Sequence, residues 1–421
     1  MALGELHPHD QHDKKSRTFR QVWAMWSRWK APRRAGMIER LFGEDKNVLP
    51  YVVALLGTVF VAATLLDAFE VVLLPRPVRH RARLNRYFFL GTWQIWSRLA
   101  SRLPAGRRRE DFIGVYGPLS MVLLFTLWAV CMIIGFGLLQ WALREITADG
   151  PSRSFAREMI VSGDAFFTLG YGDIVPRTLA ARLLVIVEAG TGFAFIAFTI
   201  SYLPVLYQHF AQRDAQIIEF AARAGTPPSA AQLLGWHIAR RQFQQLDQWL
   251  ATWESWAGEL IESHSTYPML AFYRSQHGGH SWLASLAVVL DTCTLILAGT
   301  DDGRTLQAAA TFAAARRVLN EVGSSLDVIS LPWDGNTRAA DQDIVLLIDA
   351  LKQSFEGWRN SPDTLGFVSD LRRAYEPQLS SLSVYLMLPL PDWGASSLLV
   401  AGPGQADLIH QLVRRSGTNK R

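Results

Sequence analysis

Two long apolar segments enclose a short polar one in the first half of this 421-residue chain. The earlier runs from about Gly117 to Trp141 and the later from about Leu179 to Tyr207, and each is long enough to cross a bilayer as a helix. Irregular backbone persists at membrane depth only when it is buried in protein or lines a watery path. The pattern therefore predicts two membrane helices joined by a re-entrant loop.

Six residues inside that loop have an unusual order: Thr168, Leu169, Gly170, Tyr171, Gly172 and Asp173. In a strand whose successive carbonyls all point the same way, the backbone conformation must alternate between right-handed and left-handed from residue to residue. Residues without a Cβ adopt the left-handed conformation at little cost. Gly170 and Gly172 stand where such a strand needs them. The same residues also suit an ordinary surface turn, but the flanking membrane segments favour the strand.

Over about Tyr116 to Tyr207 the sequence resembles the two-helix pore module of the potassium channel superfamily. The stretch 162–176 (SGDAFFTLGYGDIVP) followed by Arg182 looks like pore helix, selectivity filter and outer loop in family order. The resemblance implies that backbone carbonyls replace the water of K⁺, with the ion held at Thr168, Leu169, Gly170 and Tyr171. One strand cannot enclose an ion, so we expect a homotetramer around a common axis.

Asp164 matches the position where some family members carry a pore-helix acid that shares a proton with the acid after the filter, here Asp173. Two carboxyls in one crowded site do not both ionise readily, so the resemblance predicts that this pair couples and sets filter stability.

The sequence departs from the family pattern at Ile160 and Val161, where many members have a bracing Trp pair, and at Phe167, where Thr is usual. A weakly selective cation channel therefore stays as an alternative to a potassium-selective one.

The second apolar segment carries the residues expected to open the pore. Gly192 resembles the family's hinge glycine, although close helix packing explains a membrane glycine equally well, and Pro204 should kink the helix near its inner end. Helical spacing predicts that the cavity is lined by Phe193, Ile196 and Ile200. Glu188, an acid in an apolar run, is expected to bond to the back of the pore helix.

Charge and composition divide the chain into five parts. A basic segment, 1–47, is followed by an additional membrane helix, 48–74, an Arg-rich linker, 75–113, the pore domain, 114–207, and a mostly helical domain, 208–421. Arg-rich loops stay in the cytoplasm, which predicts an outward-facing filter and a cytoplasmic C-terminus in the cell (inner) membrane. The same rule favours three spans with an external N-terminus, but the basic residues before Lys46 favour the cytoplasm. A first segment that is re-entrant or lies on the membrane surface therefore stays as the alternative. Trp, Phe and Arg interleave over Arg17–Arg34 and Tyr87–Leu103, as in helices that lie at the lipid surface, and membrane adjacency disfavours nucleic acid.

The region after residue 208 should be helical, with helices near 281–298, 303–321, 338–358 and 364–375 and a short extended piece at 326–333. Neither G-x-G-x-x-G nor G-x-x-x-x-G-K-[ST] occurs, so no nucleotide cofactor is expected. A weak candidate metal or acid-base group comprises Glu259, Glu262, His264, His277 and His280. Residues 267–274 (YPMLAFYR) are expected to form a packed loop.

These features predict an all-α membrane protein that is not an enzyme: a homotetrameric potassium channel in the lipid bilayer, without cofactors, whose cytosolic regulator the sequence does not identify. The absence of repeated Arg inside a span argues against strong voltage gating. A membrane-anchored sensor or scaffold with a non-conducting pore is the alternative from a different class.

Overall fold

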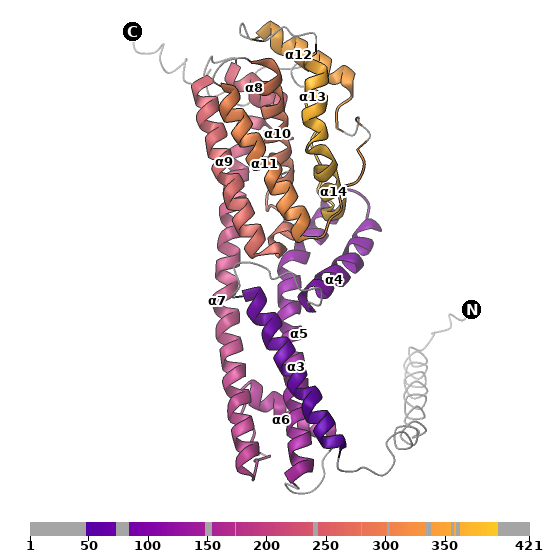
Figure 1. The fold of residues 1–421 in the computed structure, drawn as a ribbon, viewed down its shortest axis with the longest axis vertical. Coiled ribbons are helices and arrows are strands. Elements are labelled where there is room, and N and C mark those ends of the chain that lie inside the picture. The colour runs from indigo at the N-terminus through magenta and orange to yellow at the C-terminus, as the bar shows by residue number, and fades with distance from the viewer. Residues whose placement is uncertain are drawn as a thin grey trace, which may run out of the picture.

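Figure 1 shows the computed structural model, in which the described residues are 48–72, 84–147, 154–172, 174–238, 243–278, 280–300, 304–333, 335, 338–354, 358 and 363–394. Every regular element in these ranges is a helix. The expected basic segment 1–47, the start of the Arg-rich linker and Asp173 lie outside the described residues.

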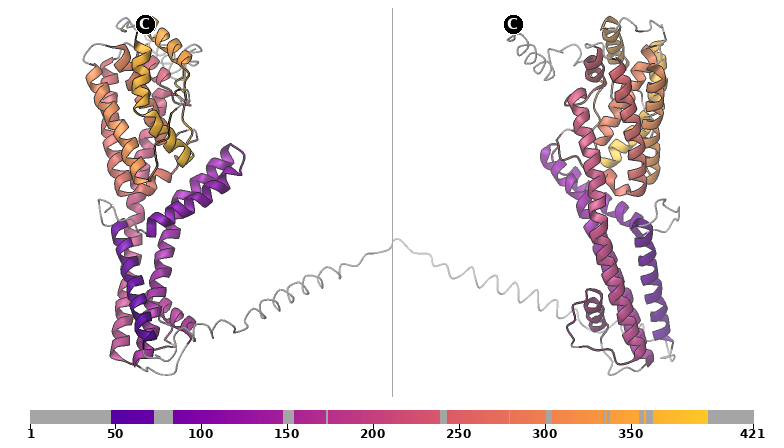
Figure 2. Two further views of the ribbon diagram at one scale, coloured as in Figure 1. Left: turned by 45° about the vertical axis from the view of Figure 1, so that its right-hand side comes forward. Right: turned by 90° about the vertical axis from the view of Figure 1, so that its left-hand side faces the viewer.

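Three long helices have the composition of membrane spans: α3 (Leu49–Val72), α5 (Arg107–Thr147) and α7 (Leu179–Ala224). α3 and α7 run in one direction and α5 in the other, while the short helix α6 (Phe155–Phe166) packs against α5 and α7 near the end where α3 begins (Figures 1 and 2). Apolar side chains such as Leu55 and Leu66 are exposed on these helices. Long apolar helices with apolar outer faces belong in a bilayer, so the protein is an all-α membrane protein.

The additional first helix, α3, is fixed to α5 at two levels. Near the end where α6 lies, a Cβ at Gly57 would come within 2.9 Å of the Gly135 carbonyl, so two small residues let the backbones approach. Toward the other end, the Asp67 carboxylate accepts hydrogen bonds from Trp128 Nε1 at 2.9 Å and from the Asn85 amide at 3.3 Å. α3 is therefore an integral part of the membrane bundle.

The hairpin formed by α4 (Leu84–Ser101) and the start of α5 leans away from the bundle axis (Figure 2). One face of α4 packs into the core of the C-terminal helical domain, where Trp93 Nε1 donates to the Tyr385 carbonyl at 3.0 Å. Tyr87 and Ile95 are exposed on other positions of α4. The expected helix is thus present, and its contact with the C-terminal helical domain was not predicted; its location at the lipid surface stays a prediction.

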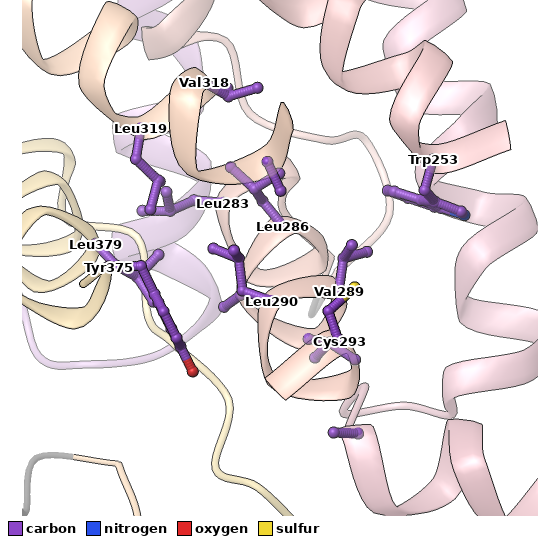
Figure 3. Close-up of a cluster of buried hydrophobic side chains, with 14 of the residues drawn as sticks. Trp253, Leu283, Leu286, Val289, Leu290, Cys293, Val318, Leu319, Tyr375 and Leu379 are labelled. Carbon is purple, nitrogen blue, oxygen red and sulfur yellow. The ribbon is translucent and has the colours of Figure 1, made fainter. Parts of the chain in front are cut away.

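The C-terminal helical domain consists of α8 (Ala230–Ile238), α9 (Phe243–Thr266), the 3-10 helix η1 (Pro268–Phe272), α10 (Trp282–Gly299), α11 (Arg304–Ser325), α12 (Asp341–Ser354), α13 (Thr364–Arg373) and α14 (Glu376–Leu386). α10 is apolar enough to pass for a fourth span, yet 94% of its apolar window is buried. Leu283, Leu286 and Leu290 of α10 meet Leu319 and Leu379 of the surrounding helices (Figure 3). α10 is the domain's central core helix.

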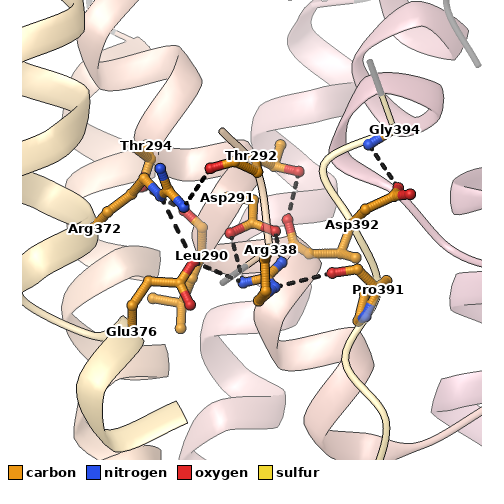
Figure 4. A network of polar contacts seen from close by, with 12 residues as sticks. Leu290, Asp291, Thr292, Thr294, Arg338, Arg372, Glu376, Pro391, Asp392 and Gly394 are labelled. Carbon is orange, nitrogen blue, oxygen red and sulfur yellow. Dashed lines mark hydrogen bonds and ion pairs between the residues drawn. The ribbon is translucent and has the colours of Figure 1, made fainter. Parts of the chain in front are cut away.

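A buried network of ion pairs and hydrogen bonds surrounds Asp291 of α10 (Figure 4). Arg338 pairs with both carboxylate oxygens of Asp291, lies 3.2 Å from Glu376, and donates to the Pro391 carbonyl at 2.9 Å. Tyr375 Oη donates to Asp291 at 2.6 Å. Buried charges are tolerated only when they are paired and hydrogen-bonded, so this network ties α10, α14 and the chain near residues 338 and 391 into one arrangement.

Most of the expected C-terminal helices are present with shifted ends, as α10, α11, α12 and α13. α14 was not predicted, and residues 328–333, inside the expected extended piece 326–333, belong to no regular element. α7 also continues past Tyr207 to Ala224, through Pro204 and without interruption. At about 1.5 Å per residue, its 46 residues span about 69 Å, which makes α7 a continuous rod from the re-entrant loop into the helical domain.

Candidate functional site

Helix α6, the expected pore helix, is held by one face. Its buried residues, Glu158, Ser162 and Phe166, recur every four positions and so form one stripe. Glu158 forms a 2.9 Å ion pair with Arg144 of α5, and Ser162 Oγ lies 2.8 Å from the Ile133 carbonyl. This stripe orients α6 against α5 and α7, so that its C-terminal end presents the 168–172 segment.

The backbone of the 168–172 segment alternates in hand. φ is +53° at Thr168, +72° at Gly170 and +74° at Gly172, with the intervening residues on the usual side. A positive φ at a β-branched residue is a genuine outlier, and such strain concentrates at functional sites. Leu169 and Tyr171 are both exposed in the single chain. The segment therefore has the alternating backbone conformation that carbonyls pointing in one direction require. Its side chains at positions 169 and 171 are exposed, so neighbouring chains would have room to pack against them.

Asp164 supports this segment directly. Its carboxylate accepts a hydrogen bond from the Tyr171 amide at 3.1 Å, and its carbonyl accepts one from the Leu169 amide at 2.9 Å. These bonds close the turn from pore helix to strand. The expected coupling of Asp164 with Asp173 stays a prediction, since Asp173 is outside the described residues.

Glu188 of α7 is fully buried behind the pore helix. Its carboxylate accepts hydrogen bonds from Ser162 Oγ of α6 and from Gln140 Nε2 of α5, so one side chain joins three helices. The expected bond to the back of the pore helix is confirmed. This cross-link braces α6 in a chain that lacks the family's Trp pair at Ile160 and Val161.

Gly192 lies where α7 crosses the end of α6, and a Cβ at Gly192 would collide with the Phe166 carbonyl. This contact accounts for a glycine by close packing; bending at Gly192 or Pro204 stays a prediction. The residues expected to line a cavity are all exposed in the single chain: Phe193, Ile196 and Ile200. Their exposure leaves them available to an axial cavity, which only neighbouring chains would close.

The 267–274 segment lies between α5 and α7 at the end of the bundle opposite the 168–172 segment. The ring of Tyr273 packs on Gly117 of α5, where a Cβ would come within 2.7 Å of it, and lies 5.5 Å from the ring of Phe210 of α7. Met269 and Leu270 share a core with the inner ends of both helices. The segment is packed as expected, but most of it forms the 3-10 helix η1 and not a loop, and its position in the bundle was not predicted.

Arg213 of α7 anchors the 267–274 segment. Its guanidinium is buried and donates to the Leu270 carbonyl at 2.7 Å and to the Tyr273 carbonyl at 2.6 Å. His264 Nε2 lies 3.3 Å from the same guanidinium, and its Nδ1 lies 3.0 Å from the Leu260 carbonyl. Burial and the nearby positive charge lower the pKa of His264 to about 3. His264 is therefore neutral, with Nδ1 as donor and Nε2 accepting from Arg213.

In the part of the chain that the structure describes, no group of three or more His, Cys, Asp or Glu residues is placed to hold a metal ion, so the metal half of the weak candidate has no support there. His264 instead accepts a hydrogen bond from Arg213. Sequence reasoning missed Arg213 and Gln140. Gln140 is a lone polar residue in an apolar run, which indicates no partner, and Arg213 lies in a polar stretch (QHFAQRDAQ) where nothing marks it for burial.

Comparison with known proteins agrees with this geometry. A family model described as an ion channel matches residues 129–208. "Uncharacterized membrane protein YdjJ" of Bacillus subtilis (strain 168) is 26% identical over 193 residues, which are 44% of this chain and 55% of that protein. The match thus spans little more than half of the relative's length, and no solved structure matches. The matched residues contain the C-terminal part of α5, α6, the 168–172 segment and α7 up to residue 208, so this part of the chain is similar to ion channels.

Proposed function

We propose that the protein is a potassium-selective channel that conducts K⁺ passively through a homotetrameric pore. The observation that carries the proposal is the alternation of positive φ at Thr168, Gly170 and Gly172. Stripping water from K⁺ requires rings of inward carbonyls at close spacing, and a strand of alternating hand is the backbone that provides them. The ion binds at Thr168, Leu169, Gly170 and Tyr171 and needs no cofactor.

The proposed tetramer is supported by the number of filter segments and by the exposed surface of one chain. Each chain contributes one 168–172 segment, and a ring of carbonyls needs several segments around an axis. The exposed positions Leu169, Tyr171, Phe193 and Ile200 supply surface for neighbours and for an apolar cavity. The filter faces outward and the helical domain faces the cytoplasm, because the Arg-rich stretch 76–109 precedes α5 and stays inside.

The helical domain acts on the gate through the 267–274 segment. α7 carries the pore's inner end and continues into the domain, while the segment fills the space between α5 and α7. Separation or approach of those helix ends requires the segment to move. The domain's regulatory role therefore has a specific mechanical link, the Arg213 anchor.

Flux from proteoliposomes tests the channel assignment. We expect K⁺ efflux without Na⁺ efflux; equal fluxes indicate the weakly selective alternative, and no flux indicates a sensor or scaffold. Gly170→Ala should abolish flux while tetramers still assemble, because φ of +72° costs an L-residue about 1–2 kcal/mol in each copy. Gly163→Ala is the matched control: it lies in the neighbouring helix α6, and nothing lies within 4 Å of its added Cβ.

A further inference from the structure

A groove of about 290 Å³ lies between α7 and α9, with His237 of α8 in its lining. Its aromatic part is a cluster of Phe220, Trp249 and Trp253, with ring centroids 4.6 Å apart for Phe220 and Trp253 and 5.3 Å apart for the two indoles. Small-molecule sites usually measure about 300–1,000 Å³. The groove therefore suits a compact ligand.

Opposite charges line the same groove. Glu219 and Arg223 of α7 are one helical turn apart and both border it. No ion pair joins either residue to another residue of the described ranges, although the Arg223 guanidinium lies 6.0 Å from the Trp236 ring. Two charges of opposite sign in one groove, with no ion-pair partner among the described residues, match a ligand that carries both signs itself.

We propose that this groove binds a small zwitterion, an amino acid or a betaine, and that binding biases the gate; the second half rests on the proposed channel function. The carboxylate of the ligand pairs with Arg223, whose planar donors suit it. Its ammonium pairs with Glu219 and with the aromatic cluster, since ring faces attract cations, methylated ammonium included. A nucleotide fits poorly, because its phosphates would meet one arginine beside a carboxylate.

The position of the groove gives it access to the gate. α7 is the inner pore helix, and α9 ends at Thr266, directly before the 267–274 segment. A ligand that bridges α7 and α9 therefore favours one spacing of the two helices that hold this segment against the pore. A ligand shifts a conformational equilibrium by its differential affinity for the two states.

Calorimetric titration of the full-length protein in lipid nanodiscs tests the site, with glycine betaine and L-leucine as probes. We expect at least one to bind, and Glu219→Gln and Arg223→Gln to weaken it about tenfold or more. Tetramethylammonium and acetate should bind more weakly than the zwitterions. The matched controls are Arg317→Gln and Glu321→Gln, which alter an exposed pair of the same spacing on α11 and should leave binding unchanged.

Three results would overturn the site: neither probe binds up to about 10 mM, the two single-charge ions bind as well as the zwitterions, or all four variants bind alike. Potassium flux with and without the bound probe tests the coupling, and we expect a change in the wild type that Glu219→Gln loses. Unchanged flux refutes the coupling. Binding that depends on Glu219 and Arg223 in a protein without any flux refutes the channel function and leaves the site standing.

Discussion

Replacement of Arg213 by Gln should release the 267–274 segment from its site between α5 and α7. Arg213 is the buried donor to two carbonyls of that segment, Leu270 at 2.7 Å and Tyr273 at 2.6 Å. A glutamine side chain is shorter and uncharged, so neither carbonyl keeps its donor. Lysine keeps the charge but lacks the planar fork, so Arg213→Lys should have an intermediate effect.

The expected size follows from these two bonds. A hydrogen bond to a charged group contributes about 1.5–3 kcal/mol, so the loss of both costs the docked state at least about 3 kcal/mol. Because about 1.4 kcal/mol is a tenfold change in an equilibrium constant, opening of the segment should become at least about a hundredfold more frequent. The remaining apolar contacts with Tyr202 and Phe210 are not altered by the substitution.

Hydrogen exchange measured by mass spectrometry in nanodiscs reports this opening. The Leu270 and Tyr273 amides donate to carbonyls within the segment at 2.9 and 3.1 Å, so their exchange requires the segment to open. Arg317→Gln, a change at an arginine that is 70% exposed, is the control and should leave the exchange unaltered. An increase of less than about threefold in Arg213→Gln would show that packing, and not the guanidinium, holds the segment.

Three further changes test the packing around the filter and the anchor. Gly192→Ala should lower the thermal midpoint or prevent assembly, because its Cβ meets the Phe166 backbone, whereas Gly190→Ala, with open space around its Cβ, should match the wild type in thermal unfolding. Glu188→Leu should destabilise the protein by about 1–3 kcal/mol, because the buried donors Ser162 and Gln140 lose their acceptor, and Glu188→Gln should destabilise it less. Equal stabilities of the two variants in chemical unfolding would contradict this expectation. The pKa of His264 is lowered to about 3, so on acidification the unfolded chain binds a proton at this residue before the folded chain does. The free energy of unfolding should therefore fall by up to about 1.4 kcal/mol per pH unit between about pH 6.5 and 3. This slope should be shallower in His264→Gln when unfolding is measured across that range.

Several features of the site could be read from the sequence because they are local. The alternation of hand at Gly170 and Gly172 needs only residues without a Cβ at those positions, and both have positive φ. Glu188 could be paired with the pore helix, because an acid in an apolar run needs a donor. Its second donor, Gln140, lies 48 residues away, and no spacing rule connects positions so distant along the chain.

The sequence by itself determined which segments must leave water and where the backbone must become irregular, because apolar composition and glycine geometry act within a few residues of the chain. Only the tertiary structure decided which neighbours those segments pack against. α10, with a mean hydropathy of 1.8 over its window, is covered by protein, while α3 and α7 keep apolar faces exposed. Residues 267–274 read only as a packed loop, yet they fill the space between the pore helices and are held there by Arg213. Burial lowers the free energy of any apolar segment in much the same way, so the choice of partner depends on shape and on paired polar groups that the fold brings together.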